Sequence, residues 1–108
     1  MLPQFLDIDT VNRQRAGSGK PYFEFLRVPA MSTGLYFVPR GGKDPQGPHR
    51  EDELYYVVNG KARMTAGNEV RTVGAGSIIF VPANVEHRFH EIEEDLIVLV
   101  VFSPAETV

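Results

Sequence analysis

Two histidines and a glutamate have the types and spacing that suit metal binding. His49 lies four residues before Glu53, where a Pro- and Gly-rich loop turns into an apolar, strand-like run. His87 begins another strand-like run much later in the chain. Because alternate side chains of a strand share a face, the even spacing allows His49 and Glu53 to point the same way. Two imidazoles and a carboxylate form a 2-His-1-carboxylate set for a divalent metal, with Fe, Mn, Ni and Zn as candidates.

Each of these residues, taken alone, also has an ordinary structural explanation. His49 would be a solvated loop histidine, Glu53 a charge at the edge of a strand, and His87 a residue that supports a turn. Buried together in a small barrel, however, they would be costly unless they were paired or bound a metal. We therefore expect a metal site. The third histidine, His90, is expected at the surface, because an inward His87 turns it outward or places it at a bulge.

Further residues are candidates for an additional ligand or for the wall of a pocket. They are Gln46, Glu51, Tyr36, Tyr55 and Phe89. Gln46 either reaches the pocket with its amide or stabilises the loop, and Glu51 either joins the site or belongs to a solvated acidic edge. A catalytic base is not evident, and the catalytic residues stay unassigned.

Composition indicates a small single domain. The chain has 108 residues, 43% of them hydrophobic and 23% charged, which is ordinary for a globular protein. The net charge of -3 and the scattered basic residues provide no footprint for nucleic acid. Cysteine is absent, which excludes disulfides and is typical of the cytoplasm. There is no signal-peptide pattern, and the longest apolar run, residues 96–102, is too short to span a bilayer.

Short β-like runs with turn residues between them predict an all-β sandwich or barrel. The expected strands are residues 22–28, 35–38, 53–58, 61–66, 69–73, 77–81, 87–92 and 96–102. Asn59-Gly60 is a strong hairpin signal, and an acidic turn at residues 93–95 would join the last two strands.

The first 20 residues form a separate arm in this interpretation, with the barrel domain at residues 21–108. The arm contains either a short helical turn, capped by Asp9 or Thr10 and running to Arg15, or irregular chain. Residues 96–102 are apolar on both faces of their strand. A small barrel has little to cover both faces, so a homodimer is expected.

Two segments resemble the two motifs of the cupin superfamily. The first motif has the pattern G-x5-H-x-H-x3/4-E-x6-G, and residues 42–60 are similar to it, with His49 and Glu53 at the second histidine and the glutamate. Gly47 occupies the position of the first histidine. The second motif, G-x5-P-x-G-x2-H-x3-N, is matched in spacing by residues 76–91, with Asn84 in place of a glycine and Glu91 in place of the asparagine.

The resemblance implies a jelly-roll barrel of about eight strands. Cupins with a full set hold a metal with three histidines and one glutamate, of which His49, Glu53 and His87 remain here. The implied function is a metal-dependent dioxygenase or isomerase acting on a small polar metabolite. The alternative is a non-catalytic module that binds a sugar or a carboxylate. Fold resemblance alone does not decide between them.

Overall fold

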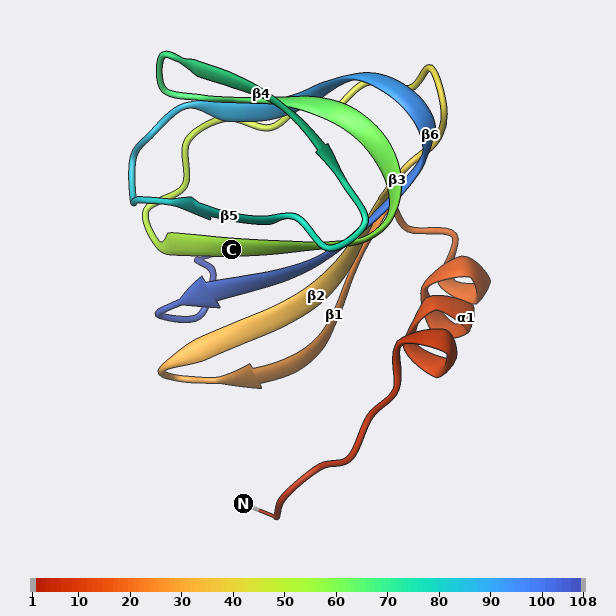
Figure 1. Cartoon of the computed structure of the whole chain (residues 1–108). Helices are drawn as coiled ribbons and strands as arrows, with labels where there is room; N and C mark the ends of the chain where they lie inside the picture. The colour runs from red at the N-terminus through yellow and green to blue at the C-terminus, as the bar shows by residue number, and fades with distance from the viewer. Residues whose placement is uncertain (1, 108) are drawn as a thin grey trace.

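The computed structural model describes residues 2–107, which form one helix and six strands (Figure 1). The elements are α1 (Ile8–Ser18), β1 (Tyr22–Val28), β2 (Met31–Val38), β3 (Asp52–Ala66), β4 (Glu69–Gly74), β5 (Ile78–Val81) and β6 (His87–Ser103). The strands pair antiparallel in the order β1-β2-β6-β3-β4, and β5 pairs with β3. This confirms the all-β barrel predicted from the sequence.

Two long strands cross the whole barrel and hold it together. The start of β3 pairs with the end of β6, as in Glu53 opposite Phe102, and the end of β3 pairs with the start of β6, as in Ala66 opposite His87. The pairing register shifts between Val57 and Arg63. In Figure 1 both strands curve strongly through this region, so that their two halves lie in opposite walls of the barrel.

The hairpin predicted at Asn59-Gly60 and the turn predicted at residues 93–95 are both wrong. Both segments lie inside continuous strands, β3 and β6, so the eight expected strands become six. Gly60 has φ = 110° and lies at a register shift, where it lets β3 bend instead of reversing it. Glu91, with φ = 49°, breaks the alternation of β6 in a similar way. Glu91 therefore faces solvent and Ile92 faces the core. Strict alternation from an inward His87 would place Glu91 inside and Ile92 outside.

The N-terminal segment contains a true helix, which is longer than the expected turn. Asp7 caps α1 and accepts a hydrogen bond from the amide of Thr10 at 2.9 Å, so the cap lies before the two predicted positions. Gly19, with φ = 71°, ends the helix in the left-handed conformation. Val11 is buried, and the guanidinium of Arg15 lies 4.4 Å from the ring centroid of Phe37 on β2. The helix therefore packs against the outside of the sheet.

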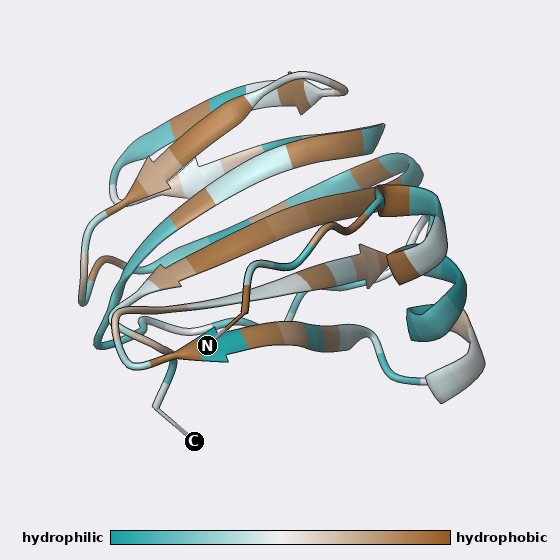
Figure 2. Ribbon diagram, turned by 90° about the horizontal axis from the view of Figure 1, so that it is seen from below, coloured by the Kyte–Doolittle hydropathy of each residue, from teal (hydrophilic) through white to brown (hydrophobic). Residues whose placement is uncertain are grey.

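The core fills the space between the walls of the barrel. Its centre includes Tyr55, Phe89, Leu96 and Val98, which are all fully buried. Figure 2 shows the apolar residues concentrated along the central strands. At the end of β6, buried residues alternate with half-buried ones such as Leu99, so the outer face of that strand is only partly covered. Within residues 2–107, no helix is long and apolar enough to cross a membrane.

Candidate metal centre

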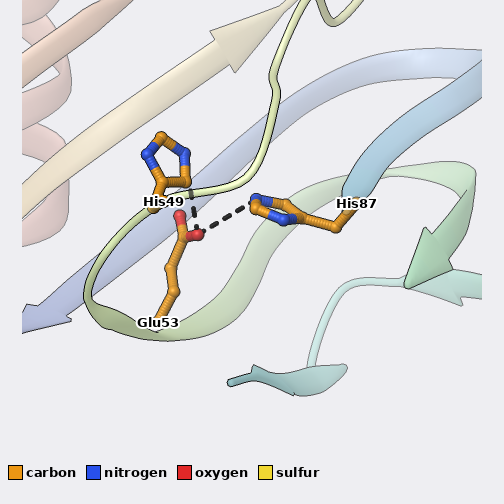
Figure 3. A group of neighbouring side chains, drawn as sticks. All are labelled: His49, Glu53 and His87. Atoms are coloured by element: carbon orange, nitrogen blue, oxygen red, sulfur yellow. Dashed lines mark ion pairs between the residues drawn. The ribbon is translucent and has the colours of Figure 1, made fainter. Parts of the chain in front are cut away.

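The structure brings His49, Glu53 and His87 together. One ligand atom from each lies within 4.8 Å of the others. Glu53 Oε1 is 3.0 Å from His87 Nε2 and 3.8 Å from His49 Nε2 (Figure 3). Glu53 lies at the start of β3, His87 at the start of β6, and His49 in the loop that leads into β3. Two segments distant in sequence therefore supply one cluster, as the spacing predicted.

The loop that carries His49 is fixed against the turn that precedes His87. The carbonyl of His49 accepts a hydrogen bond from the amide of Asn84 at 2.6 Å. Three residues further on, Asp52 accepts a bond from the amide of Ala83 at 2.9 Å. Asn84 has φ = 68°, a conformation that asparagine tolerates better than most residues. These bonds hold the two ligand-bearing segments side by side.

The facing atoms of Glu53 and His87 require a cation that binds one or both of them. Both residues are buried, and neither Glu53 Oε1 nor His87 Nε2 has a hydrogen-bond partner of suitable geometry among the described residues. His87 Nδ1 lies 2.9 Å from the carbonyl of Val85, to which it donates. In the neutral imidazole, Nε2 then carries a lone pair that faces a carboxylate oxygen. A proton or a metal ion resolves this opposition, and the donor set fits a divalent ion.

The electrostatics of His87 agree with this geometry. Burial alone would lower its pKa, because it disfavours the charged form. The nearby Glu53 carboxylate and the Val85 carbonyl outweigh burial, and the pKa of His87 is raised above its usual 6.5. Protonation of Nε2 in the metal-free protein would place a proton where the donor set offers a place to a metal.

Gln46 presents a fourth oxygen to the cluster. Its amide nitrogen donates to Asp44 Oδ2 at 2.9 Å, which turns Gln46 Oε1 the other way. That oxygen accepts a hydrogen bond from the Tyr55 hydroxyl at 3.0 Å and lies 3.2 Å from His49 Nε2. The amide is therefore oriented with its oxygen toward the ligand atoms.

Asp44, which the sequence interpretation missed, fixes this orientation. It is buried and accepts hydrogen bonds from the Tyr36 hydroxyl at 2.6 Å and from the amide of Phe89 at 2.9 Å. Because a carboxylate has no proton to donate, Asp44 can only accept from Gln46, so the assignment of the Gln46 amide follows. The local signal, a loop aspartate before proline, did not distinguish Asp44 from an ordinary turn residue.

The remaining predicted residues fall into two groups. Tyr36 lines a cavity beside the site, the ring centroid of Tyr55 is 5.9 Å from that of His87, and the ring centroid of Phe89 is 5.1 Å from that of Tyr55. Glu51 lies outside the group of ligand atoms: its buried carboxylate accepts hydrogen bonds from the amide and hydroxyl of Thr107. His90, as expected, is not part of the cluster, and its Nε2 lies 2.7 Å from the Thr65 hydroxyl.

A cavity of about 180 Å³ opens beside the ligand atoms. It is lined by Tyr22, Tyr36, Gln46, His49, Glu53, Val100, Phe102 and Glu106. Burial raises the pKa of Glu106, against the opposing effect of nearby His49. Tyr22 and Glu106 were not anticipated, because only the folded chain brings them to the site. A larger surface groove of about 620 Å³ along residues 41–45 and 88–93 does not include the three ligands.

The cluster is approached from its other side by a second cavity, at the place of the missing first histidine. This cavity, of about 270 Å³, is lined in part by Gln46, Gly47 and His87. A Cβ atom added to Gly47 would meet no atom within 4 Å. The absent side chain has therefore left open space beside the donor set instead of being replaced by other packing.

Comparisons with known proteins agree with this structure. The family model described as "Cupin domain" matches residues 34–102. An uncharacterized protein of Streptomyces coelicolor is 49% identical over 100 residues, which cover 93% of this chain and 95% of that protein.

Solved structures show the same fold at lower sequence identity. An RmlC-like cupin from Shewanella frigidimarina is 23% identical, with a TM-score of 0.69 over 76% of this chain and 73% of the other. KdgF from Halomonas sp. is 24% identical, with a TM-score of 0.70 over 77% of this chain and 76% of the other. The family match, the barrel and the position of the ligand cluster agree: this chain belongs to the cupin family.

Proposed function

We propose that this cupin binds a divalent metal through His49, Glu53 and His87 and acts on a small polar metabolite. The observation that carries the proposal is the buried, unpaired opposition of Glu53 Oε1 and His87 Nε2. A protein rarely buries two such acceptor atoms together unless a proton or a metal ion binds between them. We place the protein in the cytoplasm, a setting that the absence of cysteine favours.

Gln46 takes the place of a fourth donor in this proposal. Gly47, at the position of the first histidine, has no side chain to offer, whereas the oxygen of Gln46 already faces His49. When bound, an ion with open positions supports either reaction with O2 or polarisation of a carbonyl or enediol. The chain's own residues hold the ligands in place and exclude water with Tyr55 and Phe89. An oxygenase or an isomerase of small polar metabolites follows as the proposed class.

The open space at Gly47 favours a second candidate, a non-catalytic module that binds a small molecule. Loss of one histidine weakens a metal site, and the cavity beside Gly47 gives a ligand room on that side. Turnover distinguishes the two candidates. A compound that binds and is recovered unchanged with every metal tested favours the binding module.

Elemental analysis of the purified protein tests the metal proposal. Wild type, reloaded with Fe, Mn, Ni or Zn and then dialysed, should retain close to one metal ion per chain. His87→Ala should lose it, because one of two imidazole ligands is gone. His90→Ala is the matched control and should retain the metal, since His90 lies outside the cluster. Metal retention in His87→Ala, or its absence from folded wild type, would contradict the proposal.

We also propose that the protein forms a homodimer through the outer face of the sheet. Leu54, Tyr56, Ile78 and Phe80 are exposed there, and strand pairing places Leu54 opposite Phe80 and Tyr56 opposite Ile78. These four apolar side chains form a contiguous patch that a second copy would cover. Light scattering of the wild type should give twice the mass of one chain. The Ile78→Lys variant should have the mass of a single chain. A monomeric wild type at micromolar concentration would contradict this arrangement.

A further inference from the structure

Two residues face the ligand cluster across the cavity, and both lie outside the segment that the family model matches. Tyr22 lies on β1 and Glu106 follows β6, whereas the match covers residues 34–102. Both line the same 180 Å³ cavity as His49 and Glu53. They therefore form part of the wall that a ligand in this cavity would meet.

Tyr22 presents a buried hydroxyl that lacks a partner. Its oxygen is inaccessible to solvent and has no hydrogen-bond partner among the described residues. Gly34 on β2 makes room for the ring, because a Cβ atom at that position would overlap it. Burial is the main cause of the raised pKa of Tyr22, so the hydroxyl keeps its proton and remains a donor. A buried donor of this kind is satisfied when a ligand brings an acceptor oxygen.

Glu106 is held at the cavity by its own backbone and by its neighbour. Its amide donates to the buried Ser32 hydroxyl at 2.9 Å, and its carbonyl accepts a bond from Arg27. The next residue, Thr107, donates to Glu51 through its amide and its hydroxyl. These bonds leave the Glu106 side chain free to face the cavity, with Oε2 3.6 Å from His49 Nδ1.

Even with a divalent ion bound, the carboxylates around the cavity leave a net negative charge. Glu53 and Glu106 contribute two negative charges, which match the charge of one divalent ion. The guanidinium of Arg27 binds the Glu24 carboxylate and the backbone carbonyl of Glu106, so it is engaged on the outer side. Asp44, buried beside the cavity, adds a further negative charge to the region. A carboxylate ligand would therefore meet net repulsion, while a neutral ligand would not.

We propose that the cavity binds a small, neutral hydroxy-carbonyl compound. Tyr22 donates to one of its oxygens and Glu106 accepts from one of its hydroxyl groups, while its other end faces His49 and Glu53. At about 30 Å³ per water-sized group, the cavity holds roughly six non-hydrogen atoms. The inference rests on the proposed metal function and narrows its substrate class from small polar metabolites to neutral polyhydroxylated compounds.

Two probes of similar size, one neutral and one anionic, test this inference. Dihydroxyacetone is neutral, and glycerate is its carboxylate counterpart. Their dissociation constants for the Zn²⁺-loaded protein can be measured by saturation-transfer NMR. We expect dihydroxyacetone to bind at least about fivefold more tightly than glycerate. The inference would be overturned if glycerate bound as tightly as dihydroxyacetone or more tightly. It would also be overturned if dihydroxyacetone showed no binding at the highest concentration used.

Variants assign the effect to the two residues. Tyr22→Phe should weaken dihydroxyacetone about fivefold to tenfold, because it deletes only the donor. Glu106→Gln should improve glycerate binding and narrow the difference between the probes. Glu94→Gln, which alters an exposed residue, is the matched control for Glu106→Gln and should change neither affinity. Unchanged affinities in both cavity variants would overturn the assignment.

The test separates this inference from the metal proposal. Metal content is measured first, on the same wild-type and variant samples. If the protein binds no metal, the metal proposal fails, and at most one proton on His87 then replaces the two positive charges of the ion beside Glu53 and Glu106. Metal-free protein should therefore discriminate even more strongly against glycerate, and binding of glycerate in that state would overturn the charge argument by itself.

Discussion

Glu53→Gln should weaken metal binding about 100-fold and yet stabilise the metal-free barrel at alkaline pH. Changes outside the ligand set of a metal site already cost 10- to 100-fold in affinity, so exchange of the charged ligand for an amide should reach the upper end. In the metal-free protein the amide supplies an N–H donor to His87 Nε2, where wild type presents a carboxylate 3.0 Å away. We expect a gain of about 1 kcal/mol from that hydrogen bond.

The sign of this stability change should reverse with pH. The pKa of His87 is raised in the folded protein, so protonation of His87 stabilises wild type. That contribution is fully present below the unfolded pKa of about 6.5 and is lost as the pH rises through the raised folded pKa. Below pH 6, wild type should be more stable than Glu53→Gln, since the variant lacks the carboxylate that holds the proton.

Urea unfolding of EDTA-treated protein at pH 5.5 and pH 8.5 measures the stability difference between wild type and Glu53→Gln, whose sign should differ between the two pH values. Zinc titration measures the metal affinity. Glu94→Gln is the control, because Glu94 is exposed and outside the cluster; it should alter neither stability nor zinc binding appreciably. A Glu53→Gln protein that is less stable than wild type at pH 8.5, with zinc affinity intact, would show that Glu53 has a structural role only.

Gly60→Ala should cost at least about 2 kcal/mol of unfolding free energy. Gly60 has φ = 110°, where an L-residue is strained by about 1–3 kcal/mol. An added Cβ would also lie 2.5 Å from the carbonyl oxygen of Asp95 and 2.8 Å from the Cα of Leu96. These are backbone atoms of the paired strand, which cannot turn aside as a flexible side chain can, and overpacking adds about 1–3 kcal/mol.

Gly17→Ala provides a control of opposite sign for the same chemical change. Gly17 lies within α1, and a Cβ there meets no atom within 4 Å, so we expect stabilisation by about 0.5–1 kcal/mol. Urea denaturation midpoints compare the two variants. A cost below about 1 kcal/mol for Gly60→Ala would mean that β3 and β6 can separate locally without loss of the barrel.

Most strands could be predicted from the sequence because alternation and turn residues are short-range patterns. The even spacing of His49 and Glu53 allowed them to point the same way, although His49 lies in the loop before β3, and the meeting with His87 joins distant segments. The error at Asn59-Gly60 has a physical cause: the same left-handed glycine that closes a hairpin also permits a bulge in a continuous strand. Pairing of this segment with β6 decides between a hairpin and a bulge. The local sequence around Asn59-Gly60 does not reveal that partner.

The residues that the sequence did not reveal are those whose neighbours are distant. Asp44 acquires its role from Tyr36, Gln46 and Phe89, and no single spacing relates these residues. Tyr22 and Glu106 reach the cavity from the two flanks of the family segment, where no motif describes them. Glu51 showed the opposite failure, since its place beside the motif suggested a ligand while its carboxylate binds Thr107.

The two long strands also determine how the protein can open. Each runs through both walls of the barrel, so neither wall can unfold while the other stays intact. Glu53 and His87 lie at the starts of these strands, and each strand is paired with the other along most of its length. Amide hydrogens of β3 and β6 should consequently exchange together, through a single global event. A metal held here would keep Glu53 and His87 as ligands until both walls open, whereas His49 lies in the loop before β3.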